Sequence, residues 1–192
     1  MRPAIKMALL FSGAWILLKF ILLGINVFQD DVVKPGLINN LFLLLAISFG
    51  LYLEKKKEGF GAGTPLSDIK NALSAGAPYV LIVTVFMYFY YDSINPSFID
   101  NRVTERMDDI YAEAQDEAYV DTLRVHNPEF RVMTTDEIIK EIKADTESAL
   151  SARTLFVFSL LGLMVMALTY SIFLTVIFRK ILLRDYYPKE QG

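Results

Sequence analysis

Four long apolar segments constrain the fold of this 192-residue chain more than any other feature. They occupy residues 7–28, 36–53, 72–91 and 154–178, and only the first contains a charged residue. A helix needs about 20 apolar residues, each rising about 1.5 Å, to cross a hydrocarbon core of about 30 Å. We therefore expect an all-α membrane protein with four transmembrane helices.

The first apolar segment follows a few basic residues, as the apolar part of a secretory signal peptide also does. Lys19 interrupts the segment, however, and no small-x-small cleavage site follows it. We expect it to stay in the mature protein as the first spanning helix. Pro35 and Gly36 mark a short turn before the second segment, so the first two helices should form an antiparallel hairpin.

The stretch that precedes the third segment is amphipathic. Thr64 is a helix N-cap candidate, Pro65 suits the first helical position, and apolar residues follow at helical spacing. We expect this stretch to lie along the membrane surface. Pro78 should then kink the third helix or mark its junction with the surface stretch.

The distribution of Lys and Arg predicts the orientation, because cytoplasmic loops are enriched in both. Only Lys34 lies in the short loop between the first two helices. The opposite side collects Arg2, Lys6, Lys55, Lys56, Lys57, Lys70, Arg179, Lys180, Arg184 and Lys189. Both termini and the basic loop at 54–71 should therefore be cytoplasmic, so that residues 1–91 hold helices one to three and residues 154–192 hold helix four and a cytoplasmic tail.

The long segment 92–153 should then lie outside the cytoplasmic membrane. It carries fifteen acidic and seven basic side chains, a formal charge of −8, whereas the rest of the chain sums to +5. The lipid bilayer itself is the first expected partner, with anionic head groups attracted to the basic side. Nucleic acid is not an expected partner, because the acidic segment repels phosphate.

The acidic segment 92–153 is predicted to form a helical hairpin. Apolar residues recur every three or four positions from Asn95-Pro96 to about Arg124, which favours one amphipathic helix. His126-Asn127-Pro128 should end it, and the Thr134 and Glu137 capping-box spacing should start the next helix. Neither Gly nor Pro occurs between Pro128 and Gly162, so we expect one rod over residues 135–180, about 70 Å long.

With these features together, the chain resembles a family of small membrane proteins of Bacteroidota, domain-of-unknown-function family 4199. The resemblance rests on the Gly-rich turn before helix three, the run FMYFYYDSINPSFID, the acidic helix pair and the ending SIFLTVIFRK. It implies an inner-membrane protein of a Gram-negative bacterium. It implies no activity.

Lys19 is the most distinctive candidate site residue. A Lys near the middle of a spanning helix costs about 2.5–3.5 kcal/mol on insertion scales, and such charges often mark ion pathways. It is more simply interpreted as a structural pair, or as a side chain that extends outward to Asp30, Asp31 or Asp92. Three amides, Asn26, Asn39 and Asn40, should lie near the outer ends of helices one and two and bond between helices.

Small residues repeat every four positions in three segments, a pattern that lets membrane helices approach closely. The repeats are Ala4-Ala8-Ser12, Ala72-Gly76 and Ala167-Ser171. They suit packing within one bundle and also a homo-oligomer.

Other residues have simpler interpretations. Candidate contacts to anionic lipid are Lys55, Lys56, Lys57, Arg179, Lys180 and Arg184. The loop Gly59-Phe60-Gly61-Ala62-Gly63 lacks the Lys-Ser/Thr ending of a phosphate-binding loop and should be a flexible turn. The aromatic residues Tyr88, Phe89, Tyr90, Tyr91, Tyr186 and Tyr187 favour membrane-interface belts. His126 should be a solvated loop residue.

The residue inventory argues against catalysis. The chain has no Cys and a single His, and it lacks the paired intramembrane Asp of one class of protease. We expect no enzyme, no cofactor and no metal. The favoured function is an accessory or scaffold subunit of an envelope complex with a protein partner. The alternative is a protomer of a small oligomeric transporter or channel that uses Lys19 and the outer Asn cluster.

Overall fold

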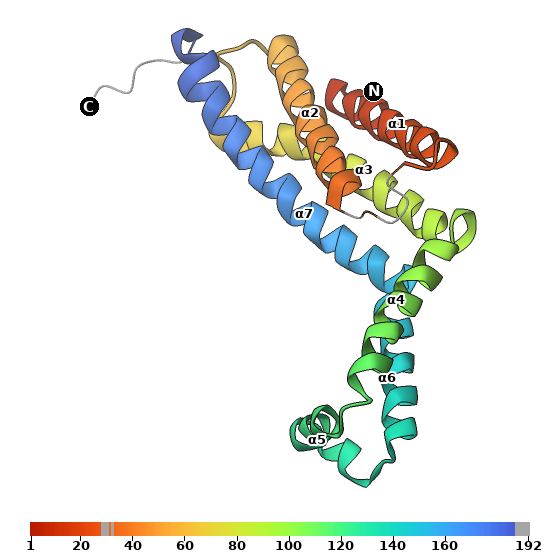
Figure 1. The fold of residues 1–192 in the computed structure, drawn as a ribbon. Helices are drawn as coiled ribbons and strands as arrows, with labels where there is room; N and C mark the ends of the chain where they lie inside the picture. The colour runs from red at the N-terminus through yellow and green to blue at the C-terminus, as the bar shows by residue number, and fades with distance from the viewer. Residues whose placement is uncertain (28–30, 32, 187–192) are drawn as a thin grey trace. The chain divides into compact units, whose positions relative to one another are not determined.

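The computed structural model describes residues 1–27, 31 and 33–186. The elements found there are all helical: α1 (Pro3–Gly24), α2 (Val33–Glu58), α3 (Pro65–Phe89), η1 (Tyr90–Ile94), α4 (Ser97–Glu113), α5 (Glu117–His126), η2 (Pro128–Val132), α6 (Thr135–Ala149), α7 (Ala152–Ile177), η3 (Phe178–Leu182) and η4 (Arg184–Tyr186). Figure 1 traces them along the chain. Four helical stretches are long and apolar enough to cross a membrane, Pro3–Gly24, Val33–Glu58, Pro65–Ile94 and Ala152–Leu182, which confirms the prediction of four such helices.

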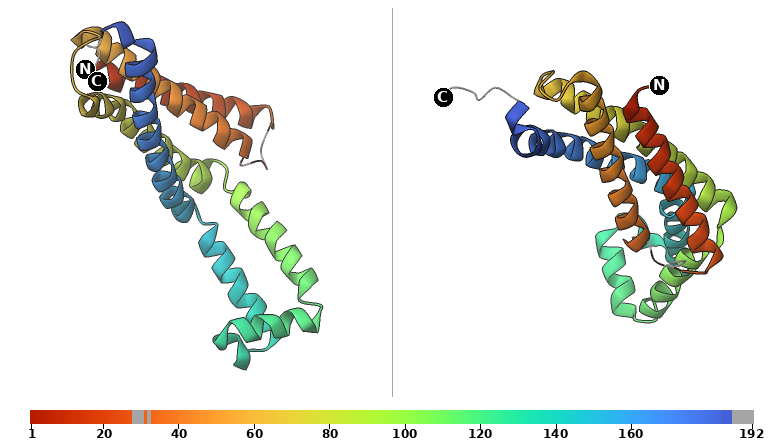
Figure 2. Two further views of the ribbon diagram at one scale, coloured as in Figure 1. Left: turned by 90° about the vertical axis from the view of Figure 1, so that its left-hand side faces the viewer. Right: turned by 90° about the horizontal axis from the view of Figure 1, so that it is seen from above.

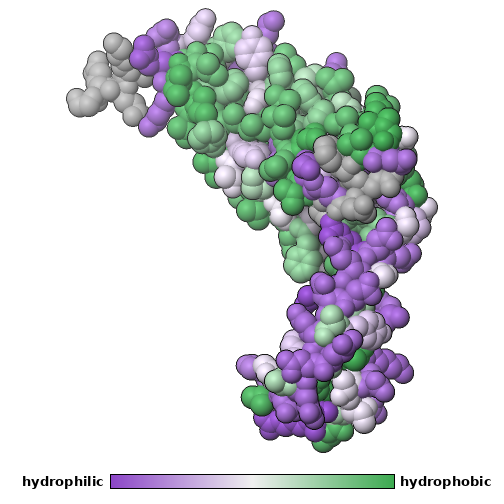
Figure 3. Space-filling model, in the orientation of Figure 1, coloured by the Kyte–Doolittle hydropathy of each residue, from purple (hydrophilic) through white to green (hydrophobic). Residues whose placement is uncertain are grey.

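The chain divides into two compact units. The bundle comprises Met1–Met87 and the described part of Phe158–Gly192, and the acidic unit comprises Tyr88–Val157. In the space-filling view, apolar residues cover much of the visible face of the bundle, whereas hydrophilic residues dominate the acidic unit (Figure 3).

The bundle is held by a core that draws on all four of its helices. Trp15 of α1, the single Trp of the chain, is 3% exposed and meets Phe86 of α3 edge to face, with ring centroids 5.9 Å apart. Leu43 and Ile47 of α2 and Leu174 of α7 belong to the same apolar cluster. The lone indole is therefore a built-in fluorescence reporter of bundle packing.

The small-residue repeats pack inside this bundle. Ala4 and Ala8 have no exposed surface, and Ser12 has 1%. A Cβ added to Gly50 of α2 would lie 2.6 Å from the Ala75 Cβ and 3.3 Å from the Ala4 Cα, so three helices meet at this glycine. Figures 1 and 2 agree that α1 and α2 lie side by side. In the structure, these small residues therefore allow helices of the same chain to approach closely.

The expected surface stretch is instead the beginning of α3. Thr64 caps the helix as predicted, because its Oγ1 accepts a hydrogen bond from the Ser67 N–H at 3.2 Å. The helix then runs through Pro78 to Phe89, and Asp68 in its first turn is buried in the bundle. The stretch is therefore continuous with α3, and its Asp68 contacts Lys55 and Arg179, which local amphipathicity does not reveal. Its position along the membrane surface stays a prediction.

The acidic unit contains α4, η2 and two further helices, α5 and α6, with α4 packed against α6 (Figures 1 and 2). The prediction of one helix up to Arg124 is wrong: α4 ends at Glu113 and α5 begins at Glu117. Asp116 causes the restart, since its carboxylate accepts a bond from the Ala118 N–H at 3.0 Å and caps α5. The end of α5 at His126 is as predicted.

The capping box at Thr134 and Glu137 is present, as predicted. Its hydrogen bonds to the Glu137 carboxylate lower the pKa of that group. The rod over residues 135–180 is wrong, because α6 ends at Ala149 and α7 begins at Ala152. Ser151 provides the reason: its hydroxyl donates to the Ser148 carbonyl at 2.8 Å and accepts from the Thr154 N–H at 3.3 Å, which replaces helical backbone bonds.

Candidate functional site

A groove of about 560 Å³ runs between α4 and the segment from Lys143 to Ala152, entirely within the acidic unit. Its floor includes half-buried Ile99 and Val103 and buried Met107. These three residues recur every four positions along α4, so they form one apolar stripe. The groove thus has an apolar surface that the described residues leave partly open to solvent.

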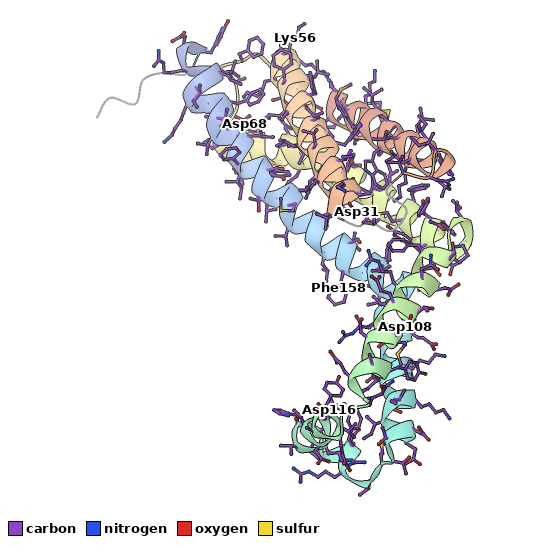
Figure 4. The ribbon with its side chains drawn as sticks, in the orientation of Figure 1. Asp31, Lys56, Asp68, Asp108, Asp116 and Phe158 are labelled. Atoms are coloured by element: carbon purple, nitrogen blue, oxygen red, sulfur yellow. The ribbon has the colours of Figure 1, made fainter. Side chains whose placement is uncertain are left out.

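The rim of the groove is acidic. Asp100 and Asp108 of α4 are exposed and flank the apolar stripe, and Figure 4 shows Asp108 on α4. Asp92 and Glu147 also line the groove. Lys143, 3.8 Å from Glu147, is the one cation among the lining residues. The groove is therefore negatively charged, as is the acidic segment 92–153 as a whole, whose formal charge is −8.

The opposite side of α4 differs. A second groove, of about 510 Å³, is lined by Arg102 and Arg106 together with Glu105 and Asp109. Its charges are mixed, so of these two grooves the first is the one that combines an apolar floor with a strongly acidic rim.

Lys19 lies on the buried stripe of α1, following Ser12 and Trp15, and is 9% exposed. The side chain therefore faces protein rather than lipid. Of its three expected carboxylate neighbours, Asp30 lies outside the described residues. Asp31 contacts Lys34 at 2.9 Å and accepts from two backbone N–H groups at the start of α2, which lowers the pKa of Asp31. Asp92 accepts a bond from Ser93.

The three expected amides have separate environments. Asn39 accepts a hydrogen bond from the Tyr79 hydroxyl at 2.6 Å, which joins α2 to α3. Asn26 is exposed just after α1, with a φ of 55°, in the left-handed conformation that Asn tolerates at helix ends. Asn40 is half-buried, and its Oδ1 has no hydrogen-bond partner among the described residues. Interhelical pairing is therefore observed for Asn39.

A buried ion cluster lies where α2, α3 and η3 meet. The Asp68 carboxylate contacts the Lys55 ammonium at 2.8 Å and the Arg179 guanidinium at 2.6 Å. The side chains of Asp68 and Lys55 are 2% and 1% exposed. We call Lys55, Asp68 and Arg179 the ion cluster; Figure 4 marks Asp68 within it.

The ion cluster also holds the Gly-rich loop. Lys55 donates to the Ala62 carbonyl, and Arg179 donates to the Gly63 carbonyl at 2.6 Å. Phe60 lies between the rings of Tyr52 and Tyr186, at 5.9 and 5.3 Å. This loop is bonded on several sides, so the prediction of a flexible turn is not supported by its contacts.

Two more carboxylates of α2 accept hydrogen bonds from neighbouring helices. Glu54 is 4% exposed and accepts a bond from the Ala4 N–H at 3.3 Å, next to the positive end of the α1 dipole. Glu58 accepts from Asn71 of α3 at 3.2 Å.

No family model, curated protein or solved structure matches this chain. The resemblance to family 4199 therefore stays a prediction, and the assignment of a function depends on the residues.

The candidate headgroup contacts divide into two groups. Lys56, Lys57, Lys180 and Arg184 are exposed and accessible to anionic lipid. The prediction is wrong for Lys55: its ammonium is 1% exposed and contacts the Asp68 carboxylate at 2.8 Å, so it is not accessible to lipid head groups. Arg179, at 18% exposure, also points to Asp68.

The aromatic residues at the end of α3 are not all exposed, as an aromatic belt at the membrane interface would require. Tyr90 and Tyr91 are 3% and 7% exposed, and the Tyr91 ring lies 4.9 Å from that of Phe98. Phe89 is 53% exposed, and Tyr187 lies outside the described residues. His126 is exposed, with Nδ1 2.8 Å from the Thr122 carbonyl, consistent with its expected solvation.

The sequence reasoning did not identify Asp68 as a buried anion. The third apolar segment begins at residue 72, so the sequence pattern places Asp68 in the amphipathic stretch before it. The Thr64-Pro65 start signal, followed without a break into the apolar segment, would have placed Asp68 in the first turn of a spanning helix.

Proposed function

We propose that the chain is a non-enzymatic integral protein of a bacterial cytoplasmic membrane and serves as an accessory or scaffold subunit of an envelope complex. The observation that carries this proposal is the groove on the acidic unit, which offers an apolar floor and an acidic rim outside the apolar bundle. Within the bundle, polar side chains such as Asp68 and Asn39 join one helix to another. These contacts hold the helices of the bundle to one another.

Recovery of a partner tests the scaffold function. We expect the tagged full chain, purified from native membranes in mild detergent, to retain a protein in a fixed molar ratio, as mass spectrometry would quantify. A chain with the acidic unit replaced by a short flexible linker should lose that protein while the bundle still inserts. A partner retained equally by both chains would contradict a role for the acidic unit.

We propose that the basic end of the bundle and both termini are cytoplasmic, and that the acidic unit lies outside. The excess of Lys and Arg in 54–71 and near the end of the chain supports this orientation. Because the chain has no native Cys, a single engineered Cys can be labelled without background.

A Cys at exposed Ala118 should react with a membrane-impermeant maleimide in intact spheroplasts, whereas a Cys at exposed Lys57 should react only after permeabilisation. Lys57 is a better site than Gly61, where a Cβ would lie 2.5 Å from the Tyr186 carbonyl oxygen. Reversed labelling of the two positions would exclude the proposed orientation.

The second candidate function, a transporter or channel protomer, is favoured by the position of Lys19 within the candidate spanning helix Pro3–Gly24 and by the Asn40 Oδ1 that lacks a partner among the described residues. Replacement Lys19→Leu distinguishes the two. Under the scaffold function, abundance should stay within about two-fold of the parent, because Leu removes the insertion cost of a charge. Growth and partner recovery should also persist. Lost growth at unchanged abundance would favour transport.

A further inference from the structure

The helix α4 presents two parallel stripes to the groove. Ile99, Val103 and Met107 make the apolar stripe, and Asp100 and Asp108 stand on the acidic stripe next to it. Residues four and eight positions apart lie above one another on a helix, so both stripes run along the α4 axis. The carboxylates of Asp100 and Asp108 are thus separated by two turns, about 12 Å along the axis.

The far wall of the groove has the same spacing. Lys143 and Glu147 follow one another at a four-residue interval on α6, and Ser151 and Ala152, at the break before α7, lie at the end of this wall. Because both walls carry side-chain ridges with helical spacing, the geometry suits a third helix, whose own ridges fit between them.

The charge of the groove selects the occupant. Four carboxylates and a single cation line it, and the acidic unit as a whole carries −8. An anionic helix would be repelled, whereas the stems of Lys or Arg can cover the apolar floor while their charged ends reach the rim. A purely apolar helix would leave the rim carboxylates facing apolar side chains.

We propose that this groove binds a cationic amphipathic helix of a partner protein. The helix presents an apolar face to Ile99, Val103 and Met107, with Lys or Arg seven or eight residues apart opposite Asp100 and Asp108. This inference deepens the proposed scaffold function by defining the chemistry of the partner, and it rests on that function for its biological meaning.

Titration of the full chain with a synthetic probe tests the inference. The chain is held in nanodiscs of zwitterionic phosphatidylcholine, and a dye is attached to a Cys placed at exposed Ala144, which does not line the groove. The probe is a peptide of about 18 residues, long enough to form a helix on binding, with Leu on one face and flanking Lys. A peptide with the same residues in scrambled order is the comparison, and empty nanodiscs give the lipid background.

We expect the patterned peptide to bind at least about ten-fold more tightly than the scrambled peptide, because only the pattern matches both stripes. The pair Asp100→Asn and Asp108→Asn should weaken binding about ten-fold, with most of the effect lost at high salt. Val103→Asn should weaken it about five-fold by making the floor polar.

The matched control is the pair Glu117→Gln and Glu129→Gln. It removes two charges from the same unit at exposed positions that do not line the groove, and it should change affinity by less than about two-fold. Equal weakening by the two pairs, or equal binding of the two peptides, would overturn the inference. Circular dichroism of each variant confirms that α4 remains helical.

The two proposals fail separately. If a native partner is recovered but the patterned peptide shows no preference for the groove, the inference is wrong and the scaffold function stands. If the peptide binds as expected but no partner is recovered, the groove is established and the scaffold function is wrong.

Discussion

Replacing Asp68 with Asn is expected to lower the free energy of unfolding of the bundle by about 3–5 kcal/mol, the range observed when one member of a buried ion pair is removed. The substitution preserves the shape of the side chain but removes the carboxylate charge that the Lys55 ammonium, 1% exposed, contacts at 2.8 Å. It also places an amide against Arg179, which the carboxylate now holds at 2.6 Å. Denaturation in mixed micelles, followed by Trp15 emission, would measure the change.

Asp185→Asn is the matched control for this prediction. Asp185 is 90% exposed and lies 3.8 Å from Arg184, so its loss should change stability by less than about 0.5 kcal/mol. Adding Lys55→Met to Asp68→Asn should recover part of the lost stability, because the double variant no longer buries the ammonium that had faced the Asp68 carboxylate. An Asp68→Asn bundle as stable as the parent would show that the ion cluster contributes nothing to folding.

Gly50→Ala is expected to destabilise the bundle by about 1–3 kcal/mol, the usual cost of overpacking. The new Cβ would lie 2.6 Å from the Ala75 Cβ and 3.3 Å from the Ala4 Cα. Neither neighbour is the end of a flexible side chain, so α1, α2 and α3 must move apart to accept it.

Gly13→Ala and Gly162→Ala test whether this cost comes from packing. Their Cβ atoms would meet nothing within 4 Å, and Ala favours a helix over Gly by about 1 kcal/mol, so both variants should be at least as stable as the parent. The same Trp15 measurement applies. If all three substitutions changed stability alike, the close approach at Gly50 would not control packing.

The sequence predicts those features that depend on neighbouring residues. Apolar length defines the four long helices, and the Thr134 and Glu137 spacing defines the start of α6. The break at Leu150 and Ser151 has equally local causes, but Ser and Thr bonds to the backbone compete weakly with helix formation and occur inside many helices. Without Gly or Pro, nothing in the pattern distinguished this serine from others.

The ion cluster depends on distant residues instead. Arg179 reaches Asp68 across 111 positions, and no periodicity in either segment indicates the other. The charge counts identified the basic side, yet they could not separate Lys55, which is buried, from Lys56, which is exposed. Likewise, the groove requires α4 beside α6, so the sequence shows its two stripes but not the opposite wall.

The separation of Arg179 from Asp68 also sets an order for biosynthesis. Lys55 and Asp68 leave the ribosome close together and can pair early, whereas Arg179 emerges 111 residues after Asp68. At about 5–20 residues per second, that interval is on the order of ten seconds. During that interval, Arg179 is not yet available to contact the Asp68 carboxylate. The ion cluster is therefore completed only after the last long helix has been synthesised. A chain truncated before Arg179 would lack the contact between Arg179 and Asp68.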